Sequence, residues 1–487
     1  MRPYTENNNL SEKDVSRLVE KVLSQLKKDE LKQPCAGAPA PEKWITPTII
    51  TNRGIGIFDD LDQAVGAASV AFEHWQNVPL ENRRKIIAAI RKACHAIVDE
   101  ISSLAVEETG LGRVEDKKSK NRLVIDKTPG VEILVPEAFT GDDGLMLMEL
   151  APFGVIGAIT PCTNPSETII NNAIGMLAAG NSVVFNPHPS AKRVSQKTLV
   201  TINEAIVASG GPANMLTTVA EPTIDVATAL MKHPGIRILV VTGGPGVVQA
   251  AMGSGKKVIA AGPGNPPVVV DETANLCQAG RDVVLGAGLD NNIVCVVEKE
   301  LFVVDSVADK LKTEMIKNGA FEIPAHQIRR LTNLVLEDGH PKKECVGKNA
   351  SVIARMAGIN VPDETRLLIL EVDENHPLVH TEMLMPVFPV VRVKDVGDGI
   401  REAVRAEGGR FHTAVMHSKN IDNLHAMARA VNTSIFVKNA PSYAGLSLGG
   451  EGYTSFTIAS PTGEGLTTAR SFSRLRRCTL KDHFRIV

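Results

Sequence analysis

The sequence predicts an α/β fold in which mostly parallel β-sheets are covered by helices. Short apolar runs alternate with segments of helical periodicity between residues 153 and 260, which is typical of consecutive β-α-β units. A second stretch of the same kind begins near residue 268. The 40 glycines, with many alanines and valines, favour close packing of helices on sheets. The 487 residues correspond to about two to four domains.

The elements of the first half can be assigned in order. Helices are expected at 61–77 and 80–109, and Gly110 provides a stop for the second helix. Strands and helices then alternate: a strand at 153–160, a helix at 166–179, a strand at 182–186, a helix at 193–208, a strand at 236–241 and a helix from about residue 247.

The second half is expected to form another α/β region. Its expected elements are a strand at 266–271, a strand-rich apolar run at 294–304, a helix at 305–319 and a strand at 434–438. The C-terminal segment carries four arginines, at positions 470, 474, 476 and 477. Two interpretations of this segment remain open: an exposed basic tail, or a strand that adds to a neighbouring subunit.

Composition excludes several classes of protein. The 53 basic and 55 acidic residues give a formal net charge of −2, which argues against binding to nucleic acid or to an anionic membrane surface. No apolar run is long enough to span a bilayer, and the polar N-terminus lacks the apolar stretch of a secretory signal, so we expect a cytoplasmic protein. The seven cysteines are widely spaced without a CxxC pair, so neither a zinc site nor a disulfide framework is expected.

The N-terminal region differs from the rest of the chain. Within residues 1–31, the apolar positions of 11–28 recur in steps of three and four, which predicts an amphipathic helix. Residues 32–43 form a Pro- and Ala-rich linker. Such a helix can pack on its own body, lie on a membrane, or dock into a groove on another protein, and the linker favours docking.

Three segments carry residues suited to catalysis. In residues 159–191, a strand ends at Thr160 and a loop holds Cys162 and Asn164, where the Asn164 amide can face a developing oxyanion. Alternatively, Asn164 is a loop residue that bonds its own backbone, and Cys162 is a small buried thiol. Residues 240–255 place glycines between a strand and a helix, an arrangement that either exposes backbone N–H groups to a phosphate or serves close packing.

The third segment, residues 288–304, places Cys295 between a polar loop at 290–292 and an apolar run. This position is compatible with a core cysteine on a strand. It is also compatible with a thiol at the mouth of a cleft, both reachable and partly desolvated.

In this order, the three segments resemble the aldehyde dehydrogenase superfamily, and more closely its CoA-acylating branch, the propionaldehyde and acetaldehyde dehydrogenases of bacterial microcompartments. The likeness extends from about residue 44 to the C-terminus, and DNNIVCVVEKE and HTEMLMPVFPVV are its most specific segments. The resemblance implies an aldehyde dehydrogenase-like fold with a Rossmann-type NAD-binding domain over 44–266 and an α/β catalytic domain over 267–448. A small β oligomerisation arm is implied near 130–150 and over 449–487, in a dimer or tetramer.

The resemblance also implies roles for individual residues. Cys295 matches the family's nucleophile, and Asn164 with the Cys295 N–H matches the oxyanion hole. Glu382 matches the residue that holds the nicotinamide-side ribose. The implied cofactor-binding set is Thr160, Pro161, Asn186, His188, Gly243, Gly244, Val247, Ala261, Gly262, Glu382 and Pro386. The implied cofactors are NAD and coenzyme A, and no metal is expected.

The sequence departs from the hydrolytic members at two places. Ala261 falls where they carry the glutamate that activates water, so a thioester on the cysteine would persist until the CoA thiol attacks it. Asn186 and Pro189 replace a lysine and a glutamate that grip the adenine-side ribose, which removes the usual basis for preferring NAD over NADP. His188, Lys192 and Arg193 are candidates to meet a nucleotide phosphate instead.

The expected function is therefore NAD-dependent, CoA-acylating oxidation of a short aldehyde, propionaldehyde first, inside a bacterial microcompartment whose shell protein binds residues 11–28. The alternatives are a hydrolytic dehydrogenase that makes a free acid, an acyl-phosphate reductase, and a non-catalytic shell-binding scaffold. His376 and His380, close to Glu382 in sequence, either assist proton transfer or CoA activation, or are solvent-facing loop histidines.

Overall fold

The computed structural model describes residues 54–487. The expected docking helix at 11–28 and the linker at 32–43 lie outside the described residues. All elements below belong to one of the two units into which the chain divides, Thr46–Val487.

The first sheet has six parallel strands, because the apolar runs of the first half are buried on both faces. In spatial order the strands are β1 (Ile57–Phe58), β6 (Leu216–Val219), β5 (Ser182–Pro187), β4 (Val155–Thr160), β7 (Ile238–Thr242) and β8 (Lys257–Ala261). Chain order reverses direction at β4, and in open parallel sheets ligands bind at such a switch point, beyond the carboxyl ends of the strands. The strands expected at 153–160, 182–186 and 236–241 are confirmed within two residues.

Eight helices accompany this sheet: α2 (Leu61–Trp75), α3 (Leu80–Ala96), α4 (Val98–Thr109), α5 (Val114–Lys127), α6 (Pro165–Ala178), α7 (Lys192–Ala208), α8 (Ile224–Lys232) and α9 (Pro245–Met252). The single helix expected at 80–109 is wrong. The backbone leaves the helical conformation at Ile97, with φ −111° and ψ 7°, and divides the segment into α3 and α4. Gly110 ends α4 at φ 67°, as expected of a left-handed C-cap.

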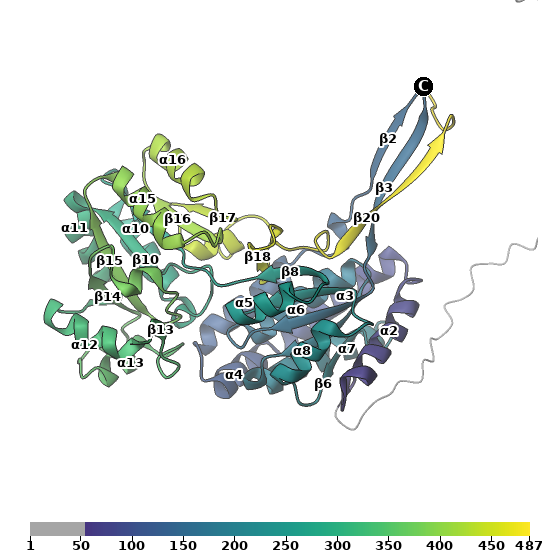
Figure 1. Cartoon of the computed structure of the whole chain (residues 1–487), viewed down its shortest axis with the longest axis horizontal. Helices are drawn as coiled ribbons and strands as arrows, with labels where there is room; N and C mark the ends of the chain where they lie inside the picture. The colour runs from purple at the N-terminus through teal and green to yellow at the C-terminus, as the bar shows by residue number, and fades with distance from the viewer. Residues whose placement is uncertain (1–53) are drawn as a thin grey trace, which may run out of the picture. The chain divides into compact units, whose positions relative to one another are not determined.

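The second sheet has seven parallel strands. Their order is β11 (Ala320–Glu322), β14 (Leu367–Glu371), β15 (Val387–Val393), β10 (Glu300–Val304), β9 (Pro267–Val270), β16 (Thr413–His417) and β17 (Ile435–Lys438). The helices of this region are α10 (Leu276–Ala287), α11 (Asp305–Lys317), α12 (Ala325–Val335), α13 (Ala350–Met356), α14 (Pro377–His380), α15 (Val396–Glu407) and α16 (Ile421–Val431). Figure 1 shows both sheets with their helices.

The strand expected at 294–304 is shorter than the sequence indicates. Only Glu300–Val304 forms β10, whereas Cys295 lies in a turn. The residues that separate them are nevertheless buried, which explains the apolar run. A short apolar run does not reveal by itself whether it is a strand or a buried turn.

The third sheet is an antiparallel arm of β2 (Glu137–Gly141), β3 (Gly144–Pro152) and β20 (Ser473–Lys481). The three strands extend away from the helices around the first sheet (Figure 1). Strand β20 pairs along its length with β3 of the same chain. The C-terminal segment is therefore not simply an exposed basic tail, and the strand that it forms adds to a sheet of its own chain rather than to that of a neighbouring subunit. Two short antiparallel pairs complete the sheets: β12 (Leu336–Glu337) with β13 (His340–Pro341), and β18 (Ile458–Ala459) with β19 (Gly465–Leu466).

Short 3₁₀ helices lie at Val131–Ile133, Pro189–Ala191, Leu289–Asn292 and Ser442–Leu446. Across residues 54–487, no helix is both long and apolar enough to cross a bilayer. In the same range, no three or more His, Cys, Asp or Glu side chains are grouped so that they could hold a metal ion.

Candidate active site

A cavity of about 560 Å³ opens at the carboxyl ends of β4, β5 and β7. It receives side chains from both α/β regions, because Cys295 and Glu382 of the second region line it together with residues that follow the strands of the first sheet. The expected site residues that line it are Thr160, Pro161, Asn164, Asn186, His188, Gly243, Gly244, Val247, Gly262, Cys295 and Glu382. Ala261, the last residue of β8, and Pro386, just before β15, are buried and do not line it.

One wall of this cavity was missed by sequence reasoning. Helix α8 contributes Ile224, Ala227, Thr228 and Met231, and α9 contributes Ala250 beside Val247. The signal was available, because the apolar residues of 224–232 recur with helical periodicity. This wall is mostly apolar, as suits a flat aromatic base such as adenine.

Cys295 is half-buried at the second-sheet side of the cavity. Burial raises the pKa of its thiol to about 12, and the Glu382 carboxylate acts in the same direction. Lys299 and Lys120 oppose the rise, as does the cysteine's own N–H. The thiol is therefore protonated in the free protein at neutral pH, and it must lose its proton as it reacts.

The turn before Cys295 is built from consecutive left-handed residues. Asp290, Asn291 and Asn292 have φ of 49°, 54° and 66°. Left-handed conformation costs about 1–2 kcal/mol per non-glycine residue, and Asp and Asn tolerate it best. This explains a DNN sequence that otherwise reads only as a polar loop.

Hydrogen bonds hold Asn292 in this conformation. Its Nδ2 donates to the carbonyl oxygens of Ala287 and Glu298, both at 2.8 Å. Lys299 Nζ donates to the Asn292 main-chain and side-chain oxygens, both at 2.7 Å, and to the Val294 carbonyl at 3.2 Å. Burial lowers the pKa of Lys299 to about 8, so most of it remains charged at neutral pH.

Asn164 lies directly before α6 and lines the cavity. Its Oδ1 accepts a hydrogen bond from Lys120 Nζ at 2.5 Å. Its Nδ2 has only a long contact of 3.3 Å to Thr163 Oγ1. The N–H of this amide is thus available to a ligand in the cavity.

Glu382 approaches the cavity from the loop between α14 and β15. Its carboxylate accepts a hydrogen bond from the Gly264 N–H at 3.2 Å. Burial raises the pKa of this carboxyl, and Lys299 opposes the rise. Two residues on, Leu384 lines the cavity with φ 53°, a rare conformation for leucine that is found mostly at functional sites.

The first-sheet side of the cavity suits a dinucleotide. Gly244 precedes α9, and a Cβ placed on it would meet no atom within 4 Å, so its backbone is open to a phosphate. Asn186 Oδ1 and Thr160 Oγ1 are buried and have no hydrogen-bond partner among the described residues. Both residues line the cavity, where ribose or amide groups of a nicotinamide cofactor could satisfy these atoms.

The two basic residues considered for phosphate binding are not brought to the cavity. Lys192 Nζ pairs with Glu221 at 2.7 Å, and Arg193 pairs with Glu107 at 3.2 Å. His188 does line the cavity, and its Nδ1 lies 2.7 Å from Ser190 Oγ.

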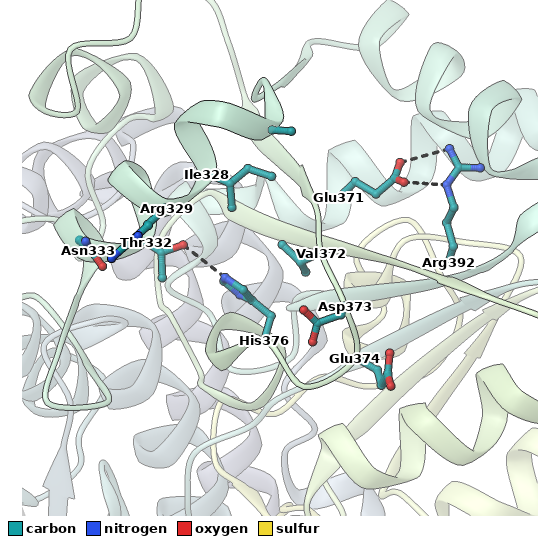
Figure 2. A pocket seen from close by; sticks show the side chains of 11 residues that line it. Ile328, Arg329, Thr332, Asn333, Glu371, Val372, Asp373, Glu374, His376 and Arg392 are labelled. Carbon is teal, nitrogen blue, oxygen red and sulfur yellow. Dashed lines mark hydrogen bonds and ion pairs between the residues drawn. The ribbon is translucent and has the colours of Figure 1, made fainter.

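The histidines near Glu382 in sequence face elsewhere. His376 lines a separate pocket of about 690 Å³ and lies 3.4 Å from Thr332 Oγ1 (Figure 2). His380 Nε2 lies 2.9 Å from the carbonyl oxygen of Glu374. The pocket of Figure 2 shares no lining residue with the cavity that contains Cys295.

A different histidine, His412, lies beside the main chain of Cys295. A Cβ placed on Gly264 would come within 2.5 Å of the Cys295 carbonyl oxygen and 3.1 Å of His412 Cγ. Burial lowers the pKa of His412 to about 3, so its ring is neutral, and Nδ1 lies 2.9 Å from Thr413 Oγ1. Sequence reasoning missed it because nothing in its local sequence connects it to Cys295.

Comparisons with known proteins agree with this geometry. The model of the aldehyde dehydrogenase family matches residues 45–321. The chain is 50% identical over 485 residues to the acetaldehyde dehydrogenase (acetylating) EutE of Escherichia coli, covering 98% of this chain and 100% of that protein. Among solved structures, it is similar to a propionaldehyde dehydrogenase from the fucose utilisation bacterial microcompartment of Clostridium phytofermentans. That match has a TM-score of 0.88 and 48% identity, covering 89% of this chain and 100% of the other.

It is also similar to a propionaldehyde dehydrogenase of Rhodopseudomonas palustris, solved with bound CoA and an acylated cysteine. The TM-score is 0.86 and the identity 49%, with 88% of this chain and 98% of the other covered. The family-model match spans more than half of the sequence, and the similarity to EutE extends over nearly all of it. The chain therefore belongs to the aldehyde dehydrogenase family.

Proposed function

We propose that this protein is a CoA-acylating aldehyde dehydrogenase that oxidises a short aldehyde to an acyl-CoA. The observation that carries the proposal is the meeting of a half-buried thiol, Cys295, with the amide of Asn164 across one cavity. The similarity to an acetylating acetaldehyde dehydrogenase and to a propionaldehyde dehydrogenase supports it.

In this mechanism, the Cys295 sulfur bonds to the aldehyde carbonyl carbon as the thiol proton passes to solvent, and a thiohemiacetal forms as its alkoxide. The carbonyl oxygen takes the negative charge and is held by N–H donors from Asn164 and from the Cys295 backbone. The glycine turn before α9 would hold NAD⁺, which would supply the acceptor for the hydride that this carbon loses. The oxidation leaves the acyl group bound to Cys295 as a thioester.

The second half-reaction is acyl transfer. The CoA thiol attacks the thioester carbonyl, the bond to Cys295 breaks, and the cysteine regains a proton. Hydrolysis is disfavoured because Ala261 supplies no carboxylate at the end of β8. Glu382 is the one carboxylate among the described residues that line the cavity, and it is already engaged by the Gly264 N–H.

Propionaldehyde is the substrate we place first, with acetaldehyde next. The support is that the two similar solved structures are propionaldehyde dehydrogenases, and that EutE is an acetaldehyde dehydrogenase. The test is a panel of two- to four-carbon aldehydes with CoA, in which acyl-CoA and free acid are both quantified by mass spectrometry. We expect one acyl-CoA for each reduced cofactor. Free acid as the main product would contradict the proposal and favour the hydrolytic alternative.

The cellular setting we propose is the lumen of a bacterial microcompartment, with residues 11–28 binding a shell protein. The amphipathic pattern of these residues and the linker at 32–43 support it, together with the microcompartment origin of one similar structure. A fluorescent fusion of residues 1–43 should enter compartments, and the chain lacking these residues should not. Equal encapsulation of the shortened chain would contradict the proposal.

We also propose a dimer or tetramer built through the arm. Strand β20 is exposed along almost its whole length, and Leu475 on β20 and Phe139 on β2 present apolar side chains to solvent. Light scattering should show a multiple of the 52.1 kDa chain. Leu475→Arg is expected to shift the population toward monomer, and a wild-type monomer would contradict the proposal.

A further inference from the structure

A buried lysine lies directly behind the amide of Asn164. Lys120, on α5, is 1% exposed, and its Nζ is 2.5 Å from Asn164 Oδ1. We propose that Lys120 is a positioning residue that fixes the orientation of the Asn164 amide, so that its N–H group faces the substrate oxygen. This inference rests on the proposed function, because it concerns the oxyanion-binding step of that reaction.

The chemistry of the ammonium group makes the orientation unambiguous. An ammonium group has hydrogens to donate and no lone pair with which to accept. Only the carbonyl end of the amide can face Lys120, so the NH₂ end points away from it. In the flipped orientation, the NH₂ group of the amide would face the ammonium group of Lys120, and two hydrogen-bond donors would oppose each other. The charged hydrogen bond between the two side chains, a type worth about 1.5–3 kcal/mol, would be lost. Without Lys120, the weak contact to Thr163 Oγ1 at 3.3 Å would be the only hydrogen bond within residues 54–487 that holds the Asn164 side chain.

Two carboxylates keep Lys120 charged inside the protein. Its Nζ lies 2.6 Å from Asp290 Oδ2 and 3.1 Å from Glu167 Oε1, and both carboxylates are buried. Burial alone lowers the pKa of Lys120, but Asp290 and Glu167 outweigh it and raise the pKa above its ordinary value. The ammonium form, which the argument requires, is therefore maintained over the working pH range.

The same charge cluster also includes a residue of the turn that leads to Cys295. Asp290 is the first of the left-handed residues that lead to Cys295, and it accepts the Arg113 N–H at 2.6 Å. Lys120 thus connects the oxyanion-binding amide with the turn that presents the thiol. Both groups are positioned relative to one buried charge cluster rather than through independent loops.

The chain supplies a matched control in Lys117, one helical turn earlier on α5. It is as buried as Lys120 and donates to the same Asp290 oxygen at 3.1 Å, although burial lowers the pKa of its ammonium group. Its other bond goes to the Thr163 carbonyl oxygen at 3.0 Å, not to the Asn164 side chain. Substituting either lysine disturbs the cluster, but only the Lys120 substitution removes the restraint on the amide.

The experiment compares Lys120→Met, Lys117→Met, Asn164→Ala and the double variant Lys120→Met/Asn164→Ala. The readouts are the pre-steady-state rate of cofactor reduction, the KM for the aldehyde, and the melting temperature. Losing one oxyanion donor costs about 10²–10³ in rate. We expect Lys120→Met to lose about 100-fold in rate with little change in KM, and Lys117→Met to lose less than tenfold. The double variant should be no slower than Asn164→Ala alone.

Equal losses for the two lysine variants would overturn the inference, as would a double variant slowed by the product of the single effects. If Lys120→Met does not fold, Lys120→Met/Glu167→Gln removes one charge of each sign from the cluster and takes its place, with the same expected loss. Failure of the proposed function has a different signature, because the wild-type protein itself would then show no aldehyde-dependent cofactor reduction, or would form free acid in place of acyl-CoA, whatever the Lys120 variant does.

Discussion

Lys299 donates hydrogen bonds to both oxygens of Asn292, main-chain and side-chain, at 2.7 Å each. A third bond, at 3.2 Å, reaches the Val294 carbonyl, so the ammonium meets three acceptors around the turn that ends at Cys295. A buried cation therefore braces the left-handed turn and lies near enough to favour the Cys295 thiolate. This geometry leads to the first prediction.

Lys299→Met is expected to slow alkylation of Cys295 by iodoacetamide about tenfold at pH 7, where most of the wild-type Lys299 is charged. The substitution removes a charge that lowers the thiol pKa, and one pKa unit corresponds to about a tenfold change in thiolate. Intact-mass spectrometry of timed samples measures the rate. Lys312→Met is the control, because Lys312 pairs with Glu322 and Glu371 and lines no part of the cavity. A Lys299 variant alkylated at the wild-type rate would contradict the role assigned to this charge.

The pH dependence of the same reaction gives a second prediction. Because burial raises the pKa of Cys295 to about 12, thiolate should increase about tenfold for each pH unit between pH 7 and 9.5. The alkylation rate is therefore expected to rise across that whole range without levelling off. A rate that bends near pH 8.5 and begins to level off above it, the behaviour of an ordinary exposed cysteine, would show that the thiol is not held in its protonated form.

The cavity contains a second thiol, which allows a matched comparison. Cys162 and Cys295 are both half-buried and both line the cavity. Cys295→Ala is expected to abolish acyl-CoA formation and the acyl adduct in protein quenched during turnover, while nucleotide binding survives. Cys162→Ala is expected to keep activity within about fivefold, because burial raises the pKa of Cys162 and the mechanism gives it no bond to make. An acyl adduct on Cys162 in the wild-type protein would reverse the assignment.

The strands were predictable where burial on both faces leaves one continuous apolar run. β5 and β7 are of this kind, and both were found within two residues of their expected bounds. Turns with buried residues were not predictable in the same way. Val296 and Val297 are buried as strand residues would be, so the sequence around Cys295 looks like a strand until the left-handed Asp290–Asn292 segment is seen.

Eleven of the thirteen expected site residues line the cavity, and the resemblance supplied most of them, whereas the wall from α8 was not expected. The residues that hold this lining in place were not predictable from the sequence. Lys117 and Lys120 lie in a run, EDKKSKNR, that looks like a solvated helix face, yet both are buried against Asp290. Buried charges depend on partners far away in sequence, and local periodicity contains no information about such partners.

The last prediction concerns stability in acid. His417 ends β16 with 1% exposure, and burial lowers its pKa to about 4, so the folded protein keeps this ring neutral. An unfolded histidine titrates near pH 6.5. Between pH 6.5 and 5.5 the unfolded chain therefore gains protons here that the folded chain does not, and the free energy of unfolding falls by about 1 kcal/mol from this residue.

His417→Gln should remove that part of the pH dependence, whatever it does to stability at pH 6.5. Urea unfolding at pH 6.5 and 5.5 measures the difference for wild type and variant, and His425→Gln, on the exposed side of α16, is the control. The wild type and the control should lose about 1 kcal/mol more than the His417 variant over this interval. An equal loss in all three would mean that His417 becomes protonated within the folded protein, and that its burial does not exclude the charged ring.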